Sequence, residues 1–277
     1  MKADCHMHMV LDGVDWKATI ACHKDSPRED LIRKALQIYA RQGYTYLRDG
    51  GDRWGVGARA RELAPEYGII YRTPLAPLCK EGHYGGFIGR YYETMAQYRD
   101  LVVQTRQAGG DFIKIMISGL MDFDRFGVLT ESPLEAEQIG QLIHIAHEEG
   151  MAVMAHANGA RTVEAAAAAG VDSVEHGAYL DKDALQAMEA AGTVWVPTLS
   201  TIGNLRGKGR FSELDVAKIL DSALENVASY GGLIAPGTDA GAWSVPHGSE
   251  TELPLLREAG IDGERLEAGI AAIRKKF

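Results

Sequence analysis

Cysteine is scarce in this chain of 277 residues. The three cysteines, Cys5, Cys22 and Cys79, include no Cys-x-x-Cys pair and do not form a disulfide framework. Long apolar runs are also missing, because none approaches the ~20 residues that span a bilayer. Residues 1–6 lack the apolar core of a signal peptide. We therefore expect a soluble, cytoplasmic protein that does not act at a membrane.

Basic residues are also fewer than acidic ones. The chain has 29 Lys and Arg against 38 Asp and Glu, a formal net charge of −9, whereas surfaces that hold phosphate backbones are usually basic. The glycine-rich residues 50–57 lack both the Gly-x-Gly-x-x-Gly spacing and a P-loop lysine. These features argue against a nucleic-acid partner and favour a small-molecule or short-peptide substrate.

What the chain does have is a regular alternation of short apolar runs with longer segments of helical period. This alternation is typical of a parallel α/β fold. The two segments Ser26-Pro27-Arg28-Glu29 and Ser132-Pro133-Leu134-Glu135 each predict a capping box at a helix start. Eight strands are predicted, at residues 3–9, 44–48, 69–78, 112–117, 152–156, 171–175, 194–199 and 233–238.

Eight such units predict a (β/α)8 TIM barrel, which at about 250 residues would use nearly the whole chain. We therefore expect residues 1–277 to form a single TIM-barrel domain. A doubly wound open sheet is the alternative, since alternation alone does not distinguish the two. The number of units and the places of the reactive residues favour the barrel.

His6 and His8 are two residues apart in the first predicted strand, so both side chains leave the same face and can grip one ion. Taken alone, a His-x-His pair is more often incidental. Lys114 lies within the apolar fourth strand, where a buried ammonium is costly. It either extends its amine to the strand end or an acid, or carries a carbamate formed with carbon dioxide, whose oxygens can bridge two cations.

Three further polar residues stand at the carboxyl ends of predicted strands: His156, His176 and Asp239. Barrel enzymes place their reactive residues at those ends. A single histidine there is usually structural, and Asp239 is also suited to cap the next helix. Their joint occurrence with His6, His8 and Lys114 favours a shared metal site instead.

These motifs together resemble the amidohydrolase superfamily, and most closely its imidazolonepropionase-like and prolidase-like group. The resemblance runs from about Asp4 to Gly260. It rests on Asp4-Cys5-His6-Met7-His8, Lys114, Met154-Ala155-His156-Ala157-Asn158, Val174-Glu175-His176-Gly177 and Gly237-Thr238-Asp239-Ala240-Gly241, supported by residues 45–50, 196–199 and 247–249.

The resemblance implies two divalent metal ions and a function. His6, His8 and Asp239 would hold one ion, His156 and His176 the other, and carboxylated Lys114 would bridge them. Zinc suits these ligands best, although manganese, cobalt, nickel or iron are alternatives. The implied reaction is hydrolysis of an amide bond in an acyl amino acid, dipeptide or cyclic amide, with Asp239 exchanging the proton of the activated water.

Loops after the strands supply the expected substrate contacts. His83 and Tyr84 follow the third strand, and the basic loop containing Arg206 and Arg210 follows the seventh, where it would meet a substrate carboxylate or would simply be solvated. Trp243 and His247 are further candidates close to Asp239.

Two other functions use the same residues: a phosphotriesterase or lactonase, and a metal-binding protein without turnover. The small β-rich domain that many relatives carry is not evident, since only residues 1–3 precede Asp4 and residues 265–277 predict no strand. We expect either a barrel-only member or one with trimmed ends, whose exposed flank is covered in a homo-oligomer.

Overall fold

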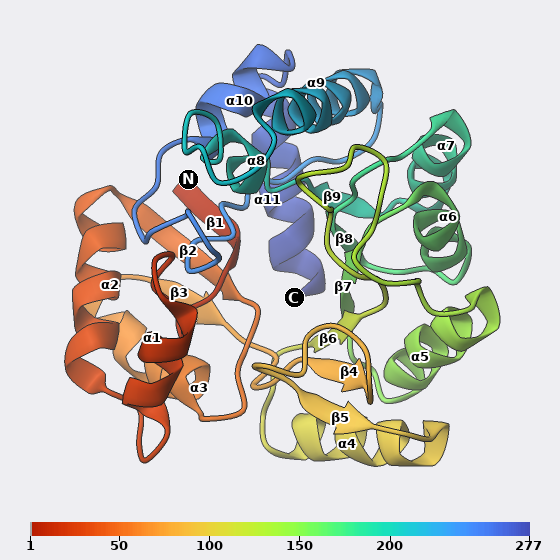
Figure 1. The fold of residues 1–277 in the computed structure, drawn as a ribbon. Helices are drawn as coiled ribbons and strands as arrows, with labels where there is room; N and C mark the ends of the chain where they lie inside the picture. The colour runs from red at the N-terminus through yellow and green to blue at the C-terminus, as the bar shows by residue number, and fades with distance from the viewer. Residues whose placement is uncertain (1) are drawn as a thin grey trace.

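The computed structural model describes residues 2–277 and shows an α/β fold in which neighbouring strands run parallel. One sheet has the strand order β1-β2-β3, and the other has the order β5-β4-β6-β7-β8-β9. The two sheets stand on either side of the centre, with helices outside them (Figure 1). The strands are β1 Lys2–Met7, β2 Tyr44–Asp49, β3 Ile70–Arg72, β4 Leu78–Lys80, β5 Arg90–Tyr92, β6 Ile113–Met116, β7 Val153–Ala157, β8 Ser173–His176 and β9 Val194–Val196.

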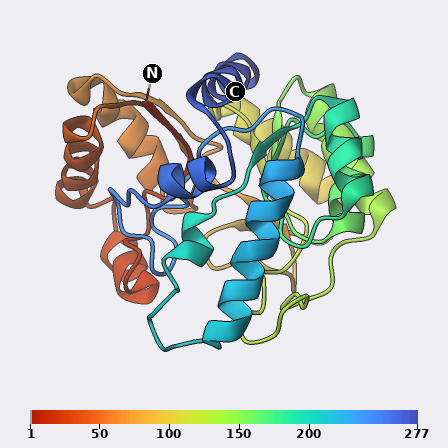
Figure 2. The same ribbon diagram turned by 90° about the horizontal axis from the view of Figure 1, so that it is seen from above.

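Helices follow most strands and bury one apolar face against them, as Ile139, Leu142 and Ile143 do in α5. The longest of them, α9, runs along one side of the molecule (Figure 2). Across residues 2–277, no helix is long and apolar enough to cross a membrane. The helices are α1 Trp16–His23, α2 Glu29–Arg41, α3 Val56–Leu63, the 3₁₀ helix η1 Ala64–Tyr67, α4 Met95–Gln107, α5 Ala136–Glu148, α6 Ala160–Ala168, α7 Lys182–Ala191, α8 Ser200–Gly203, α9 Glu213–Ser229, α10 Glu252–Glu258 and α11 Gly263–Lys276.

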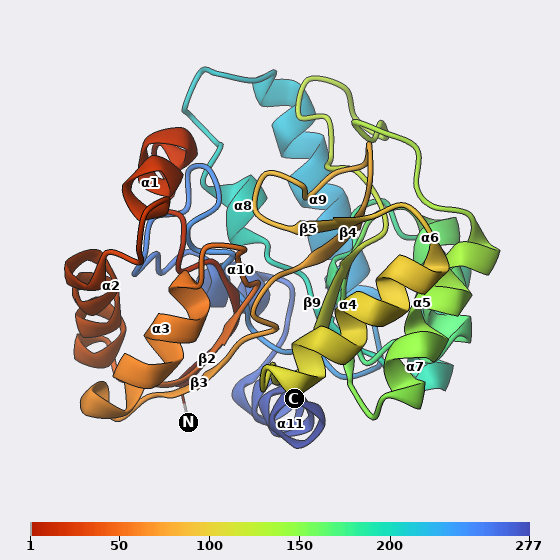
Figure 3. The same ribbon diagram turned by 90° about the horizontal axis from the view of Figure 1, so that it is seen from below.

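The last helix, α11, covers the end of the fold at which the strands begin. Its Ile270 and Ile273, with Phe277 beyond it, pack in a buried cluster with Ala3 and Phe112 from the starts of their strands. Figure 3 shows α11 at the opposite end of the molecule from α1. One end of the strands is therefore packed with apolar side chains, and polar groups at the other end are free to form a site.

Residues 233–240 connect the two sheets through backbone hydrogen bonds. On one side the amide of Trp195 donates to the carbonyl of Leu233 at 2.9 Å, and on the other the amide of Cys5 donates to the carbonyl of Pro236 at 2.8 Å. The amide of Asp239 donates to the carbonyl of His6 at 2.7 Å. Asp239 is thereby fixed to the strand that carries the two histidines.

The α/β class with parallel strands is confirmed, whereas a closed eight-stranded barrel is not. The predicted eighth strand, residues 233–238, makes one isolated bridge within the described chain, between Ile234 and Trp195, since Pro236 has no amide to donate. The predicted third strand is divided into β3 and β4, because Pro74 and Pro77 interrupt its ladder and Leu75 has a φ of 64°. Strand β5 was not predicted.

Both predicted capping boxes are wrong. Helix α2 begins at Glu29 and α5 at Ala136, and among residues 2–277 neither start receives a side-chain cap. Arg28 and Glu135, the residues before these helices, have extended backbones. Each helix therefore begins two or more residues after the proline of its Ser-Pro pair.

Candidate metal centre

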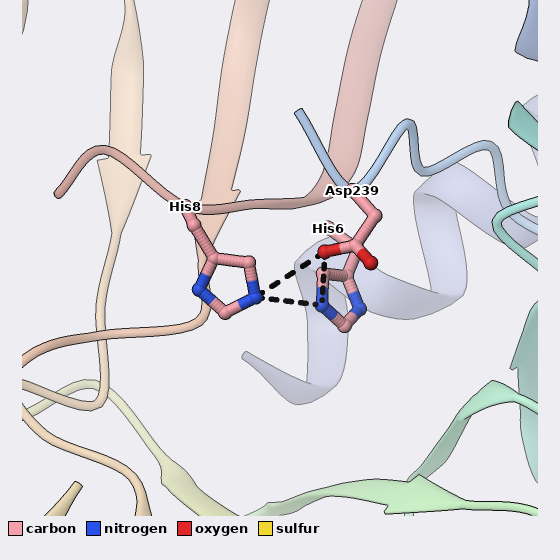
Figure 4. A group of neighbouring side chains, drawn as sticks. All are labelled: His6, His8 and Asp239. Carbon is pink, nitrogen blue, oxygen red and sulfur yellow. Dashed lines mark hydrogen bonds and ion pairs between the residues drawn. The ribbon is translucent and has the colours of Figure 1, made fainter. Parts of the chain in front are cut away.

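His6, His8 and Asp239 converge at one point, although 231 residues separate His8 from Asp239 (Figure 4). The Nε2 atoms of His6 and His8 are 3.4 Å apart, and Asp239 Oδ1 lies 3.4 Å from the first and 3.3 Å from the second. All three residues are buried. These atoms form a nearly equilateral triangle of electron-pair donors, which is the arrangement of one face of a tetrahedral metal site.

A buried carboxylate orients the first histidine. Glu175 Oε2 lies 2.6 Å from His6 Nδ1, so Nδ1 carries the proton and Nε2 is left as a donor of electrons. Glu175 is itself held by Arg48 Nη2, which donates to its Oε1 at 2.8 Å, and by the hydroxyl of Ser173. Arg48 Nε also donates to the carbonyl of Cys5 at 2.6 Å, which joins β1, β2 and β8 at the metal site.

Room for His8 depends on a glycine at the end of β2. A Cβ atom at Gly50 would lie 2.2 Å from His8 Cε1, closer than any real contact. The amide of Gly50 donates to the carbonyl of Met7 at 2.8 Å, so the backbone here is fixed next to the histidine. Only glycine allows the imidazole to occupy this place.

Lys114 reaches the same cavity from β6. Its Nζ is buried and has no hydrogen-bond partner within residues 2–277. Burial lowers the pKa of this amine to about 8, although the carboxylates of Glu175 and Asp239 favour its charged form. A buried amine without a partner, whose lowered pKa gives it a larger neutral fraction than an ordinary lysine has, is chemically poised to react with an electrophile.

His156 and His176 lie side by side, with ring centroids 4.5 Å apart. His156 Nε2 is 3.2 Å from the carbonyl of Gly119, and His176 Nδ1 is 2.7 Å from Thr198 Oγ1. One nitrogen of each ring is thereby engaged by the protein, and the other is available to a ligand. The ring of His176 is also 5.0 Å from that of His6, so the two pairs adjoin.

The buried histidines are held in the neutral form that ligates metals. Burial, followed by nearby cations, lowers the pKa of His156 to about 3 and puts the pKa values of His6 and His176 well below the usual range. Neutral imidazoles accept a metal ion without first losing a proton.

The backbone is strained at these positions. His176, Thr198 and Asp239 have φ angles of 67°, 49° and 55°, in the left-handed region that β-branched residues above all avoid. Each such residue costs on the order of 1–3 kcal/mol, and such strain gathers at functional sites. Here the strained residues are two candidate ligands, His176 and Asp239, and Thr198, which contacts His176.

A cavity of about 370 Å³ opens above these groups. All six candidate ligands line it, together with Tyr84 and Trp243 from the loops. The remaining walls are largely apolar and aromatic. The structure therefore brings together every residue that the sequence predicted for metal binding, at the end of the strands opposite α11.

The other predicted substrate contacts lie outside the set of residues that line this cavity. His83 Nδ1 is 3.6 Å from Glu131, and His247 is bound through both ring nitrogens, to Tyr39 and to the carbonyl of Leu11. Arg206 and Arg210 are exposed, and both lie in the loop before α9. Substrate contact by these four side chains stays a prediction.

Sequence reasoning missed the residues that hold the ligands in place. Glu175, Arg48 and Thr198 touch ligands or their partners but were not singled out. A signal for two of them was present, since Arg48 and Glu175 are the charged last residues of the predicted strands 44–48 and 171–175. Their pairing across the fold could not be derived without the structure.

No protein-family model matches the chain. Among curated proteins it is similar to an ochratoxinase of Aspergillus niger, with 25% identity over 311 residues. The match covers 92% of this chain and 62% of that relative, so the chain spans less than two thirds of the relative's length.

Solved structures share the fold. A Xaa-Pro dipeptidase with bound methionine has a TM-score of 0.77 at 21% identity, with 99% of this chain and 75% of the other covered. A putative prolidase from Bifidobacterium longum has a TM-score of 0.74 at 23% identity, with coverages of 99% and 69%. The crystal structure of the A. niger ochratoxinase has a TM-score of 0.74 at 22% identity, with coverages of 98% and 68%.

Proposed function

These similarities to amidohydrolase-family proteins support assigning the chain to the amidohydrolase superfamily, with the prolidase-like proteins, and from that premise we propose a metal-dependent amide hydrolase. Its substrate is an acyl amino acid, a dipeptide or a cyclic amide. The observation that carries the proposal is the triangle of His6 Nε2, His8 Nε2 and Asp239 Oδ1, with edges of 3.3–3.4 Å.

This donor set fits a transition metal. A tetrahedral ion with bonds of about 2.0–2.1 Å has ligand atoms about 3.3–3.4 Å apart, which matches the triangle. The Glu175 carboxylate on His6 Nδ1 is the kind of partner that metal-ligating histidines usually have. Nitrogen and oxygen donors together favour zinc, with manganese, cobalt, nickel or iron as alternatives.

A second ion would be held by His156 and His176, with Lys114 between the two sites. The unpartnered Nζ of Lys114 supports this part of the proposal, because a carbamate there would give the buried side chain two oxygens to share between cations. Asp239 Oδ1 likewise lacks a hydrogen bond within the described residues, as expected of an atom reserved for a metal.

Bound cations of this kind polarise a carbonyl and bring the pKa of water to about 7. The chain's own contribution is made chiefly by Asp239, whose carboxylate lines the cavity and is positioned by the bond from its amide to His6. We assign it to take a proton from water and to deliver it to the departing amine. Glu175 keeps His6 in one tautomer throughout.

The fold proposed for this enzyme is a (β/α)8 barrel. Residues 233–240 hydrogen-bond to β9 and to β1, and the amide of Asp111 donates to the carbonyl of Thr73 at 2.9 Å on the other side. These bonds join the two sheets at both gaps, which supports a ring of eight strand positions around the site.

The test begins with metal content. The purified protein is expected to bind about two equivalents of zinc, manganese or cobalt in the presence of bicarbonate, and then to hydrolyse at least one member of a panel of acyl amino acids, dipeptides and cyclic amides. Lactones and phosphotriesters in the same panel test the alternative activities. Protein that holds less than one equivalent and gains no hydrolysis on loading contradicts the proposal.

Asp239→Asn separates an enzyme from a metal-binding protein. The variant is expected to keep much of the metal, since the amide oxygen can still ligate, and to lose turnover by at least about 100-fold because the proton acceptor is gone. Asp181→Asn is the matched control, since Asp181 caps α7 and asparagine caps equally well. Equal turnover in both variants would exclude the proposed role of Asp239.

A further inference from the structure

Asn158 is the first residue after β7 and lines the cavity beside the second pair of candidate ligands, His156 and His176. We propose that Asn158 is a positioning residue that orients both of these histidines, and that it thereby sets the affinity for the second ion without affecting the first. This role presupposes the proposed function, because it requires an ion held by the two histidines.

The side chain of Asn158 is fully buried, and both ends of its amide are hydrogen-bonded. Its Nδ2 donates to the carbonyl of Gly119 at 3.0 Å, and its Oδ1 accepts from the amide of Ala178 at 3.0 Å. The backbone amide of Asn158 also donates to Ser118 Oγ at 2.8 Å. One residue therefore connects the segments that follow three neighbouring strands, β6, β7 and β8.

His156 shares a hydrogen-bond acceptor with Asn158. His156 Nε2 lies 3.2 Å from the carbonyl oxygen of Gly119, the same oxygen that accepts from Asn158 Nδ2. Because a carbonyl oxygen can only accept, this bond requires the proton on Nε2 and leaves the electron pair on Nδ1 for a metal ion. By holding the oxygen in place, Asn158 fixes the tautomer and the direction of the imidazole.

His176 lies at a strained turn that Asn158 stabilises. His176 and Gly177 have successive φ angles of 67° and 65°. The next residue is Ala178, whose amide donates to Asn158 Oδ1 and whose carbonyl accepts from the amide of Gly159 at 2.8 Å. A left-handed histidine persists only where the surrounding bonds hold it. The two bonds to Ala178 keep the turn that places His176 at the cavity.

The first set of candidate ligands, His6, His8 and Asp239, is held by other groups. Glu175 orients His6, and the amide of Asp239 donates to the carbonyl of His6. Within residues 2–277, no hydrogen bond joins Asn158 to any of the three. A change at Asn158 should therefore weaken the second ion selectively, whereas a general loss of structure would weaken both.

Zinc titration of two variants tests this role. Asn158→Leu keeps a side chain branched at Cγ but has neither donor nor acceptor, and Asn158→Ala serves as a second variant if the bulkier leucine does not fit. In metal-stripped protein supplied with bicarbonate, we expect the first equivalent to bind within about threefold of the parent affinity and the second to bind about 10–100-fold more weakly. Circular dichroism checks that the variants are folded.

Asn226→Leu is the matched control. Asn226 Nδ2 donates to the carbonyl of Leu180 at 3.0 Å, so the same kind of bond is lost. Asn226 belongs to α9 and is not among the residues that line the cavity. The control is expected to lower the melting temperature while both equivalents of zinc bind as in the parent protein.

Nitrogen-15 NMR of the metal-free protein reports on His156 directly, because it distinguishes the two imidazole tautomers. The parent protein is expected to carry the proton of His156 on Nε2. In the Asn158 variants the carbonyl of Gly119 is held less firmly, so a mixture of the two tautomers should appear.

Three results overturn the inference: a second equivalent that binds both Asn158 variants as tightly as the parent, equal weakening of both equivalents, or loss of folding in both variants. A parent protein that binds fewer than two ions contradicts the proposed function instead. In that event NMR decides the role of Asn158, which is excluded if the parent carries the proton of His156 on Nδ1 or if the variants leave the tautomer unchanged.

Discussion

The carboxylate of Glu175 lies 2.6 Å from His6 Nδ1, and this contact leaves His6 Nε2 facing His8 and Asp239. The two residues belong to β8 and β1, which lie in different sheets. The orientation of the candidate metal ligand His6 is therefore set by a residue of the other sheet.

Glu175→Gln is expected to lower zinc affinity about 10–100-fold, because a neutral amide holds the protonated Nδ1 of His6 less firmly. The substitution also leaves Arg48 buried without its anion, so the free energy of unfolding should fall by about 3–5 kcal/mol. Metal titration and chemical denaturation measure the two effects separately.

Ser173→Ala is the control for that experiment, since Ser173 binds Arg48 and Glu175 but not His6. It should lower stability by about 1–3 kcal/mol with little change in zinc affinity. Loss of metal binding in Ser173→Ala equal to that in Glu175→Gln would mean that the cluster acts through folding alone.

Gly50→Ala should weaken metal binding because the added Cβ would displace the His8 ring, 2.2 Å away at Cε1. Overpacking of this kind costs about 1–3 kcal/mol of stability. The matched control is Gly140→Ala in α5, where within the described chain nothing lies within 4 Å of the added atom and the helix should gain about 0.5–1 kcal/mol. Unchanged zinc affinity in Gly50→Ala would contradict the close contact.

The carboxylation of Lys114 should depend on pH in the metal-free protein. Its pKa is lowered to about 8, and only the neutral amine attacks carbon dioxide. At fixed dissolved carbon dioxide, the initial rate should therefore rise about tenfold for each pH unit below 8 and level off above it. Carbon-13 NMR with labelled bicarbonate detects the carbamate signal. A signal that survives Lys114→Gln would assign it to another amine.

Glu252 should make the protein progressively less stable as pH rises from about 4.5 to 8. Burial raises the pKa of its carboxyl to about 8, above its usual value of 4.5. The folded state therefore retains a proton that the unfolded state has released, and this stabilisation is lost as pH rises through 8. The slope attributable to Glu252 is at most about 1.4 kcal/mol per pH unit.

Glu252→Gln tests this assignment, because glutamine has nearly the same shape and can still accept from the amide of Ser200, now 2.7 Å from Glu252 Oε2. Between pH 6.5 and 8 the variant should lose less stability than the parent protein in urea denaturation. The lower limit avoids the histidines, whose lowered pKa values give stability that is lost as pH falls below about 6.5. Parallel curves for both proteins would exclude Glu252 as the source.

Much of the fold was accessible from local patterns. The alternation of apolar runs and helical segments predicted six strands close to their observed places, from β1 at Lys2–Met7 to β9 at Val194–Val196. It failed where backbone chemistry overrides side-chain pattern: at Pro74 and Pro77, which divide the third run, and at Pro236, which reduces the eighth run to a single bridge. Strand β5, with only three residues, is too short for periodicity to mark.

The sequence by itself determined the chemistry of the candidate site. His6, His8 and Lys114 were found within predicted strands, His156, His176 and Asp239 at strand ends, and the family resemblance implied that they share metal ions. Tertiary structure alone decided how that chemistry is held and what it faces. Glu175 meets His6 across 169 residues, and Tyr84 and Trp243 reach the cavity from separate loops. Neither relationship has a period or a spacing, since contacts between distant segments depend on how the whole chain packs.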